Sequence, residues 1–295
     1  MNLYLAGQRL NEVIGELSLS KTREEAAATL SAVVLTAAAD TYFPGLTLAL
    51  GDAVTLSDDS GTRFSGGVQE ISRTPRIVTF TAYDRGIYLA RNELYGVFSG
   101  SGADIAAQVA AQLGISLGTV DAPSGFQTIV TSSGDTAYDI LRQAVGEDRE
   151  IAVEGGRLCI GGRNAAPVPI QKERILAVES VGSIGEMVNR AVVLKRGTVT
   201  PLAQAQDAVA LAAYGQFQSA RALSGDSAQA QANAALRGAA YTARLTVMGD
   251  LALRCGGAVA LAAPEWGLEG NFSITGVEHR WKAGQFTTDL DLRRA

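Results

Sequence analysis

The chain has 295 residues, of which 47% are hydrophobic and 19% are charged, so it can build more than one apolar core and is not mainly disordered. Its 25 basic and 30 acidic residues include no basic cluster, which argues against sequence-specific nucleic-acid binding. The 33 glycines against 7 prolines are typical of the turns and bulges of a β-rich fold.

The start of the chain shows no secretory pattern, because Met1–Tyr4 lacks a basic and an apolar signal region. The longest apolar stretch, residues 30–39, contains Ser31 and Thr36 and is too short to span a bilayer. We therefore expect a protein that is made in the cytoplasm without a signal peptide and without membrane insertion.

Residues 1–95 are expected to form a first β-barrel-like domain. Apolar and polar residues alternate at 16–20, 46–50 and 78–83, the period of half-buried strands. Residues 58–61, Asp-Asp-Ser-Gly, are a strong turn signal. The segment 23–36 mixes helix-favouring and β-branched residues, and we expect a turn that leads into a strand.

Residues 96–166 are expected to form a small α+β module. One helix starts after Ser101 and Asp104, carries apolar residues four apart, and stops at Gly114. A second helix is expected to open at Asp135 and to end at Gly146. Two short strands around Gly155-Gly156 then predict a hairpin.

A Gly/Pro/Ala-rich linker at 161–169 leads into residues 167–295, which we expect to form a second β-barrel-like domain. It includes a strand at 191–194, a helix near 226–237, and further strands from Thr242 onward. The expected fold class is therefore β-rich α+β, with two antiparallel β-barrel domains and the module between them.

An internal repeat supports this organisation. The run Leu48–Leu56 resembles Leu251–Leu261, with Val54 matching Val259 and two extra residues in the second copy. A polar loop, an aromatic strand and an alternating strand follow each run. The repeat predicts two similar antiparallel domains on either side of the inserted module.

Candidate catalytic carboxylates occur in equivalent loops of the two copies. Asp58 and Asp59 lie in the first loop and Glu265 in the second, so a carboxylate-dependent glycan hydrolase is one alternative function. The two loops belong to different expected barrels, and solvated turn carboxylates are the default interpretation. The sequence contains no GxSxG elbow and no P-loop, and we expect no enzyme activity.

The remaining chemically interesting side chains point to structural roles. Trp266 lies in a loop and is a candidate contact residue, which leaves a glycan- or receptor-binding module as a second alternative. Trp281 and His279 lie on one expected strand, where we expect core or interface packing. Cys159 and Cys255 have no motif around them. No cofactor, metal or catalytic residue is predicted.

Several ordered segments resemble the baseplate hub family of contractile tails and prophage-derived tail particles, which is related to the late control D-like and XkdQ-YqbQ-like hub proteins. The Asn189 run resembles the family's strand that opens the second barrel, and Tyr214-Gly215 resembles its tyrosine-glycine pair before a helix. The segments that carry the resemblance are Phe80–Arg85, Gln112–Ile115, Met187–Val193, Ala213–Gly215 and Gly270–His279.

The resemblance implies a structural, non-enzymatic role: a homotrimeric adaptor that joins a hexameric tail tube to a trimeric central spike. Three chains with two tube-protein-like barrels each would give a six-fold-like ring. The implied partners are a second copy of the chain, the tube protein and the spike, with tape-measure and baseplate wedge proteins as further candidates. The implied location is the baseplate of a virion tail or tail-like particle, assembled in the bacterial cytoplasm. The interaction-surface candidates are Asp58, Asp59, Glu265 and Trp266.

Overall fold

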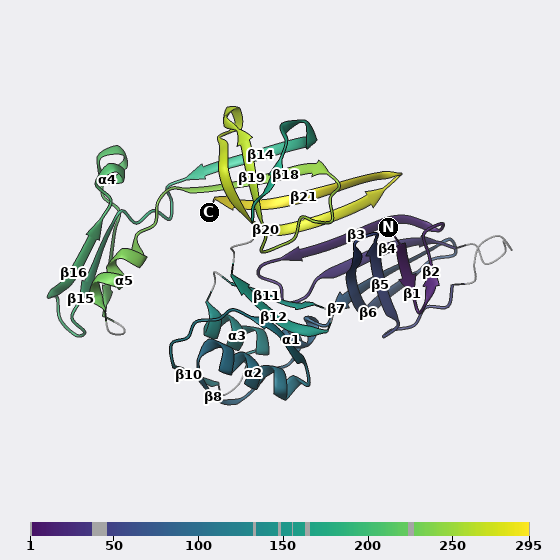
Figure 1. The fold of residues 1–295 in the computed structure, drawn as a ribbon, viewed down its shortest axis with the longest axis horizontal. Helices are drawn as coiled ribbons and strands as arrows, with labels where there is room; N and C mark the ends of the chain where they lie inside the picture. The colour runs from purple at the N-terminus through teal and green to yellow at the C-terminus, as the bar shows by residue number, and fades with distance from the viewer. Residues whose placement is uncertain are drawn as a thin grey trace. The chain divides into compact units, whose positions relative to one another are not determined.

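The computed structural model describes residues 2–36, 46–131, 134–146, 149–154, 156–162, 166–223 and 227–294 (Figure 1). Strands make up 54% of the chain and helices 17%, and the main feature is a large curled antiparallel sheet, which confirms the expected β-rich class. By internal contacts the chain forms two compact units, one of residues 1–178 with Arg244–Arg293 and one of Glu179–Ala243 with Arg294. The division into 1–95, 96–166 and 167–295 stays a prediction.

The N-terminal part of the large sheet follows the alternation seen in the sequence. Its strands are β1 (Asn2–Leu5), β2 (Gln8–Arg9), β3 (Ile14–Thr22), β4 (Thr29–Leu35), β5 (Ala53–Asp58), β6 (Gly61–Arg73) and β7 (Ile77–Asp84). The inward side chains, among them Leu17, Leu30 and Phe80, form one apolar core. The expected turn before a strand at 23–36 is confirmed by β4, within the described residues up to Thr36.

The expected strand at 46–50 is wrong. Residues 46–49 are irregular, and a turn begins at Leu50. The Asp52 carboxylate accepts a hydrogen bond from the Ala49 amide at 2.8 Å and so holds the chain in a local loop instead of a ladder. Leu48 is buried, whereas Leu50 is 68% exposed. The alternation of apolar residues at 46–50 therefore does not mark a strand, and Leu48 alone of these two leucines packs into the core.

The C-terminal part of the sheet contains β13 (Val168–Ile170), β14 (Ile175–Ser183), β18 (Ala240–Met248), β19 (Ala258–Ala263), β20 (Leu268–Lys282) and β21 (Gln285–Arg294). The short 3-10 helix η1 (Lys172–Arg174) precedes β14, and η2 (Pro264–Trp266) joins β19 to β20. Val54 lies on β5 and its sequence match Val259 lies on β19, so the repeat falls on corresponding hairpins.

The strand order shows the duplication directly. One half of the sheet runs β3-β4-β7-β6-β5-β1, and the other runs β14-β18-β21-β20-β19-β13 in the same relative order. The outermost pair differs, because β1 is antiparallel to β5 whereas β13 is parallel to β19. The chain therefore carries two copies of one six-strand pattern.

The two copies are joined edge to edge into one sheet. Strand β20 pairs antiparallel with β3 from Gly276↔Thr22 to Lys282↔Glu16 (Figure 1). Beside this junction Trp281 stacks on Phe286 with ring centroids 4.3 Å apart and packs against the core of the first copy. Gly249 makes room for the stack, because a Cβ there would lie 2.1 Å from the Phe286 ring. Trp281 is thus an interface residue, as expected.

The segment between the copies folds into the expected α+β module. Helices α2 (Gly102–Leu113) and α3 (Ala137–Val145) both begin with capping boxes, from Ser101 with Asp104 and from Thr136 with Asp139. The second helix therefore opens on Thr136, one residue after the expected Asp135. The described ends of the expected hairpin are β11 (Arg149–Glu154) and β12 (Arg157–Gly162); Gly155 lies outside the described residues.

The module contains further elements that the sequence did not indicate. They are α1 (Ile87–Arg91), β8 (Gly96–Gly100), β9 (Ser116–Val120) and β10 (Gln127–Thr131). Strand β10 pairs antiparallel with β8, and β9 runs parallel to β12. Residues such as Phe98, Ile105 and Leu141 fill a core of its own.

Residues 179–243, together with Arg294, form the second compact unit and lie within the range that the sequence assigns to the second barrel. Its three-stranded sheet consists of β15 (Arg190–Leu194), β16 (Pro201–Gln206) and β17 (Gln218–Ala222). Helix α4 spans Ala208–Tyr214 and α5 spans Ala228–Ala235. The expected helix near 226–237 is therefore found as α5, while Asp226 lies outside the described residues.

Two motifs that carried the family resemblance meet inside this unit. Asn189 is buried and lies just before β15. Its Nδ2 donates to the Gly215 carbonyl at 2.7 Å, and its Oδ1 accepts from the Phe217 amide at 2.8 Å. Tyr214-Gly215 ends α4 and does not precede a helix, so the expectation for that pair is wrong. Gly215 of this pair supplies the carbonyl that accepts the hydrogen bond from Asn189.

Candidate functional site

The carboxylates of the first loop lie at the β5–β6 turn. Asp58 accepts hydrogen bonds from the Arg63 Nε at 2.7 Å and from the Ser60 amide at 2.8 Å. The Arg63 contact is the main reason why the pKa of Asp58 lies below its usual value. Asp59 is exposed at the tip of the turn. Asp58 therefore stabilises the hairpin turn, and Asp59 adds a negative charge at its tip.

Glu265 and Trp266 lie at the matching turn of the second copy, in η2 between β19 and β20. Glu265 forms an ion pair with Lys172, and this hydrogen bond lowers the pKa of Glu265. The same Lys172 ammonium stands 5.4 Å from the centre of the Trp266 ring. A glycosidase acid needs a raised pKa, and the pKa values of Asp58 and Glu265 are shifted in the opposite direction.

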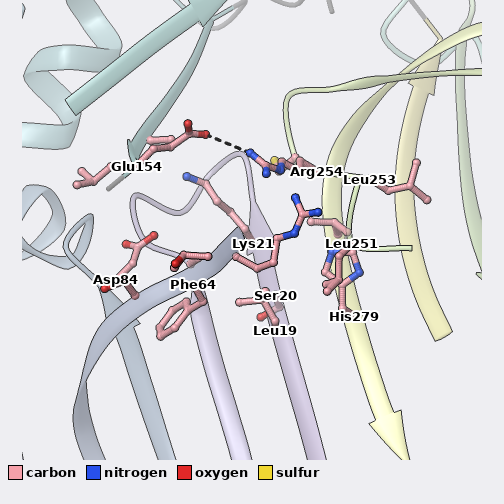
Figure 2. A pocket seen from close by; sticks show the side chains of 18 of the residues that line it. Leu19, Ser20, Lys21, Phe64, Asp84, Glu154, Leu251, Leu253, Arg254 and His279 are labelled. Carbon is pink, nitrogen blue, oxygen red and sulfur yellow. Dashed lines mark ion pairs between the residues drawn. The ribbon is translucent and has the colours of Figure 1, made fainter. Parts of the chain in front are cut away.

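A cavity of about 280 Å³ lies elsewhere in the large unit, where both sheet halves and the module meet (Figure 2). Leu19, Phe64 and Leu251 supply apolar walls, and Lys21 and Asp84 supply charge. Figure 2 shows the ion pair at its rim, in which Arg254 Nη1 stands 3.9 Å from Glu154 Oε1.

Lys21 is the centre of this cavity's electrostatics. Its Nζ lies 3.4 Å from Glu150 Oε1 and donates to the Ile151 carbonyl at 3.1 Å. Burial raises the pKa of Glu150 and of Asp84, and the Lys21 charge opposes both shifts. Strand β3 of the first copy is thereby tied to β11 of the module through a poorly solvated ion pair. The sequence held no signal for it, because the partners are distant in the chain.

Cys255 borders the same cavity but is not a reactive thiol. Its Sγ donates to the Thr275 carbonyl at 3.3 Å. Burial first, and then the nearby Glu150 carboxylate, raises the pKa of the Cys255 thiol to about 12. At neutral pH the side chain is a protonated thiol without nucleophilic character.

His279 lies on β20 with only 4% of its surface exposed. Its Nδ1 is 3.0 Å from Thr288 Oγ1, and that hydroxyl accepts from the Asp250 amide at 3.0 Å. The hydroxyl proton is then available to Nδ1, which places the ring proton on Nε2. Burial is the main cause that lowers the pKa of His279 to about 4. The neutral ring is a satisfied core group, as the sequence suggested.

Among the residues that the structure describes, no group of three or more His, Cys, Asp or Glu side chains is arranged to hold a metal ion. Within the same residues no helix is long and apolar enough to cross a membrane.

Comparison with known proteins identifies the family of this chain. The YQBQ-like family model matches residues 17–293, which is nearly the whole chain. The chain belongs to the YQBQ-like family. The phage-like element PBSX protein XkdQ of Bacillus subtilis (strain 168) is 26% identical over 310 residues, covering 95% of this chain and 93% of that protein.

Solved structures show the same fold. The 43 kDa tail protein of prophage MuSo2 from Shewanella oneidensis has a TM-score of 0.72 at 14% identity, covering 99% of this chain and 97% of that one. A tail protein from Neisseria meningitidis MC58 has a TM-score of 0.72 at 14% identity, with coverage of 99% and 95%. This YQBQ-like chain therefore has the fold of these prophage tail proteins, and the family resemblance seen in its sequence is confirmed.

Proposed function

We propose that this YQBQ-like protein is a homotrimeric baseplate hub that joins a hexameric tail tube to a trimeric central spike. The observation that carries the proposal is the duplicated strand order, which gives each chain two copies of one six-strand pattern. Three chains then present six similar sheet segments to one partner while keeping three-fold symmetry for the other.

The hairpin tips indicate which end of the ring meets the tube. The β5–β6 turn with Asp58 and Asp59 and the β19–β20 turn with Glu265 and Trp266 occupy equivalent places in the two copies. In a trimer of duplicated chains these turns form six similar contacts at one end. We assign these four residues to the tube-facing surface, because a hexameric partner needs six similar contacts.

We assign the spike-facing surface to parts of the chain that occur once per subunit, because a trimeric spike needs only three equivalent contacts. The tape-measure and baseplate wedge proteins remain further candidate partners. The role is geometric, and the cation-bound state of Asp58 and Glu265 favours it over glycan hydrolysis.

Co-assembly with the tube protein and the spike from the same phage-type element tests this function. We expect one complex with three hub chains bound to a tube hexamer and a spike trimer. Replacing Asp59 and Glu265 by lysine should weaken the tube contact at least ten-fold and leave the spike contact intact. The matched control is Asp135→Lys, an exposed carboxylate of the module. Absence of binding to both partners would refute the adaptor.

A further inference from the structure

Strands β8 and β10 of the module form a two-stranded ribbon with one buried and one exposed face (Figure 1). Phe98 and Ile129 point into the core that the ribbon shares with α2 and α3. On the opposite face, Val97 is 65% exposed and Val130 is 71% exposed. The two valines lie directly opposite each other in the register. The ribbon therefore carries an apolar pair on its solvent side.

Two aromatic residues extend the exposed face. Tyr95 directly precedes β8 and is 82% exposed, and Phe126 directly precedes β10 and is 79% exposed. Both positions continue the alternation of the two valines. Residues 94–101 and 122–131 contain no charged side chain. An exposed aromatic and aliphatic surface without charges has the composition of an interface.

The outer edge of β10 presents outward-pointing backbone groups. On β8, the Ser99 amide donates to Gln108 Oε1 at 3.4 Å, and the Ser99 carbonyl accepts from Gln108 Nε2 at 2.8 Å, so both groups point away from β10. Ser99 lies opposite Thr128, and the backbone groups of such a pair point away from each other on both strands. Those of Val130, two residues on, point the same way. Among the described residues, none forms a backbone hydrogen bond along this edge.

The two edges of the ribbon differ in their protection. The Gln108 side chain occupies the edge of β8 at Ser99, whereas Thr128 and Val130 are both exposed on the edge of β10. Lysine, proline or a bulge normally blocks an edge strand. Strand β10 contains no lysine and no proline, and its register with β8 is regular. An open edge beside an apolar face can bind an extended segment by strand addition.

We propose that the outer edge of β10 binds one extended, uncharged strand of the trimeric spike, whose alternate apolar side chains cover Val130 and Phe126. This inference rests on the proposed hub function and names a contact of its spike-facing surface. The ribbon belongs to the module, which occurs once per chain, whereas the six-strand pattern occurs twice. A hub trimer therefore presents three such edges, one for each chain of the spike.

Thr128→Pro tests the edge. Proline removes the outward amide and leaves the hydrogen bonds between β8 and β10 in place. The variant should keep its melting temperature and its trimer, and it should bind the purified spike trimer at least ten-fold more weakly in calorimetric titration. Thr128→Ala is the matched control, because it keeps the amide and should bind the spike like the wild type.

Hydrogen exchange of the wild-type hub gives a second readout that needs no substitution. In the free hub, the amides of Thr128 and Val130 should exchange at least ten-fold faster than the amide of Ile129, which points toward β8. Addition of the spike should slow both exposed amides at least ten-fold. Slow exchange of these amides in the free hub would show that a second copy of the chain covers the edge, and would refute the proposal.

Failure of this contact differs from failure of the hub function. A spike that binds Thr128→Pro as tightly as the wild type and leaves the amides of Thr128 and Val130 unprotected would overturn the proposed contact alone. A wild-type hub that does not bind the spike would overturn the proposed function as well.

Discussion

At the residue scale, His279 shows how burial makes the fold sensitive to acid. Its pKa is about 4 in the folded protein against 6.5 in the unfolded chain, so the unfolded state binds more protons between these values. The stability that depends on the neutral ring is complete above pH 6.5 and is lost as the pH falls toward 4. The shift corresponds to at most about 3 kcal/mol.

The prediction for His279 concerns the difference between two pH profiles. His279→Gln removes the titrating ring, so the variant should lose less stability than the wild type between pH 7 and pH 5. We expect the two free energies of unfolding, measured with urea at each pH, to converge by about 1–2 kcal/mol. Parallel profiles would show that the ring does not titrate as its burial requires.

Lys21 offers a second test at the residue scale. Lys21→Met leaves Glu150 buried without its cation, and breaking a buried pair from one side costs about 3–5 kcal/mol. Burial already raises the pKa of Glu150, and loss of Lys21 should raise it further. A raised carboxyl pKa means that stability is kept below the unfolded pKa and lost as the pH rises through the folded pKa.

The Lys21→Met variant should therefore be destabilised more at pH 8 than at pH 5, as measured by urea unfolding. The double variant Lys21→Met/Glu150→Leu serves as the control, because it removes both charges and should recover most of the loss at pH 8. An equal loss at both pH values would show that Lys21 acts through packing alone.

At the scale of elements, Asn189 connects β15 to the segment after α4 through two hydrogen bonds. Asn189→Ala leaves the Gly215 carbonyl and the Phe217 amide without these partners, at a cost of about 2–4 kcal/mol. We expect limited proteolysis to cut residues 184–239 at least ten times faster. The exposed Asn233→Ala in α5 is the matched control. Unchanged cutting in Asn189→Ala would refute this role.

Elements with a local signal could be predicted from the sequence, and long-range pairings could not. Strands β3 and β7 show period-two alternation, and α2 has its cap, apolar stripe and Gly114 stop within a short window. The repeat of Val54 at Val259 even predicted the duplication. The pairing of Leu19 with His279 has no local trace, because it depends on how two distant hairpins meet.

The contacts of the candidate site could not be predicted from the sequence, because they too join residues that are far apart in the chain. Asp58 and Glu265 were found from turn composition, but their cations Arg63 and Lys172 gave no pattern. The Lys21–Glu150 ion pair joins two separate elements, and neither residue stands in a motif. Burial changes the chemistry of such groups, and burial of a single charged residue is set by the tertiary fold.

At the scale of the whole molecule, the duplicated sheet links sequence and function. A duplicated chain can occupy two nearly equivalent positions in one ring, so a trimer can match a hexamer without six separate subunits. The internal β3–β20 contact fixes the spacing of the two copies within one chain. The charged hairpin tips would then recur six times around one end.

The solution mass of the purified chain tests this account most directly. Light scattering should give three times 30.7 kDa, and electron microscopy of that species should show a ring with six similar lobes. A mass of 30.7 kDa that persists after the tube protein and the spike are added would contradict the account.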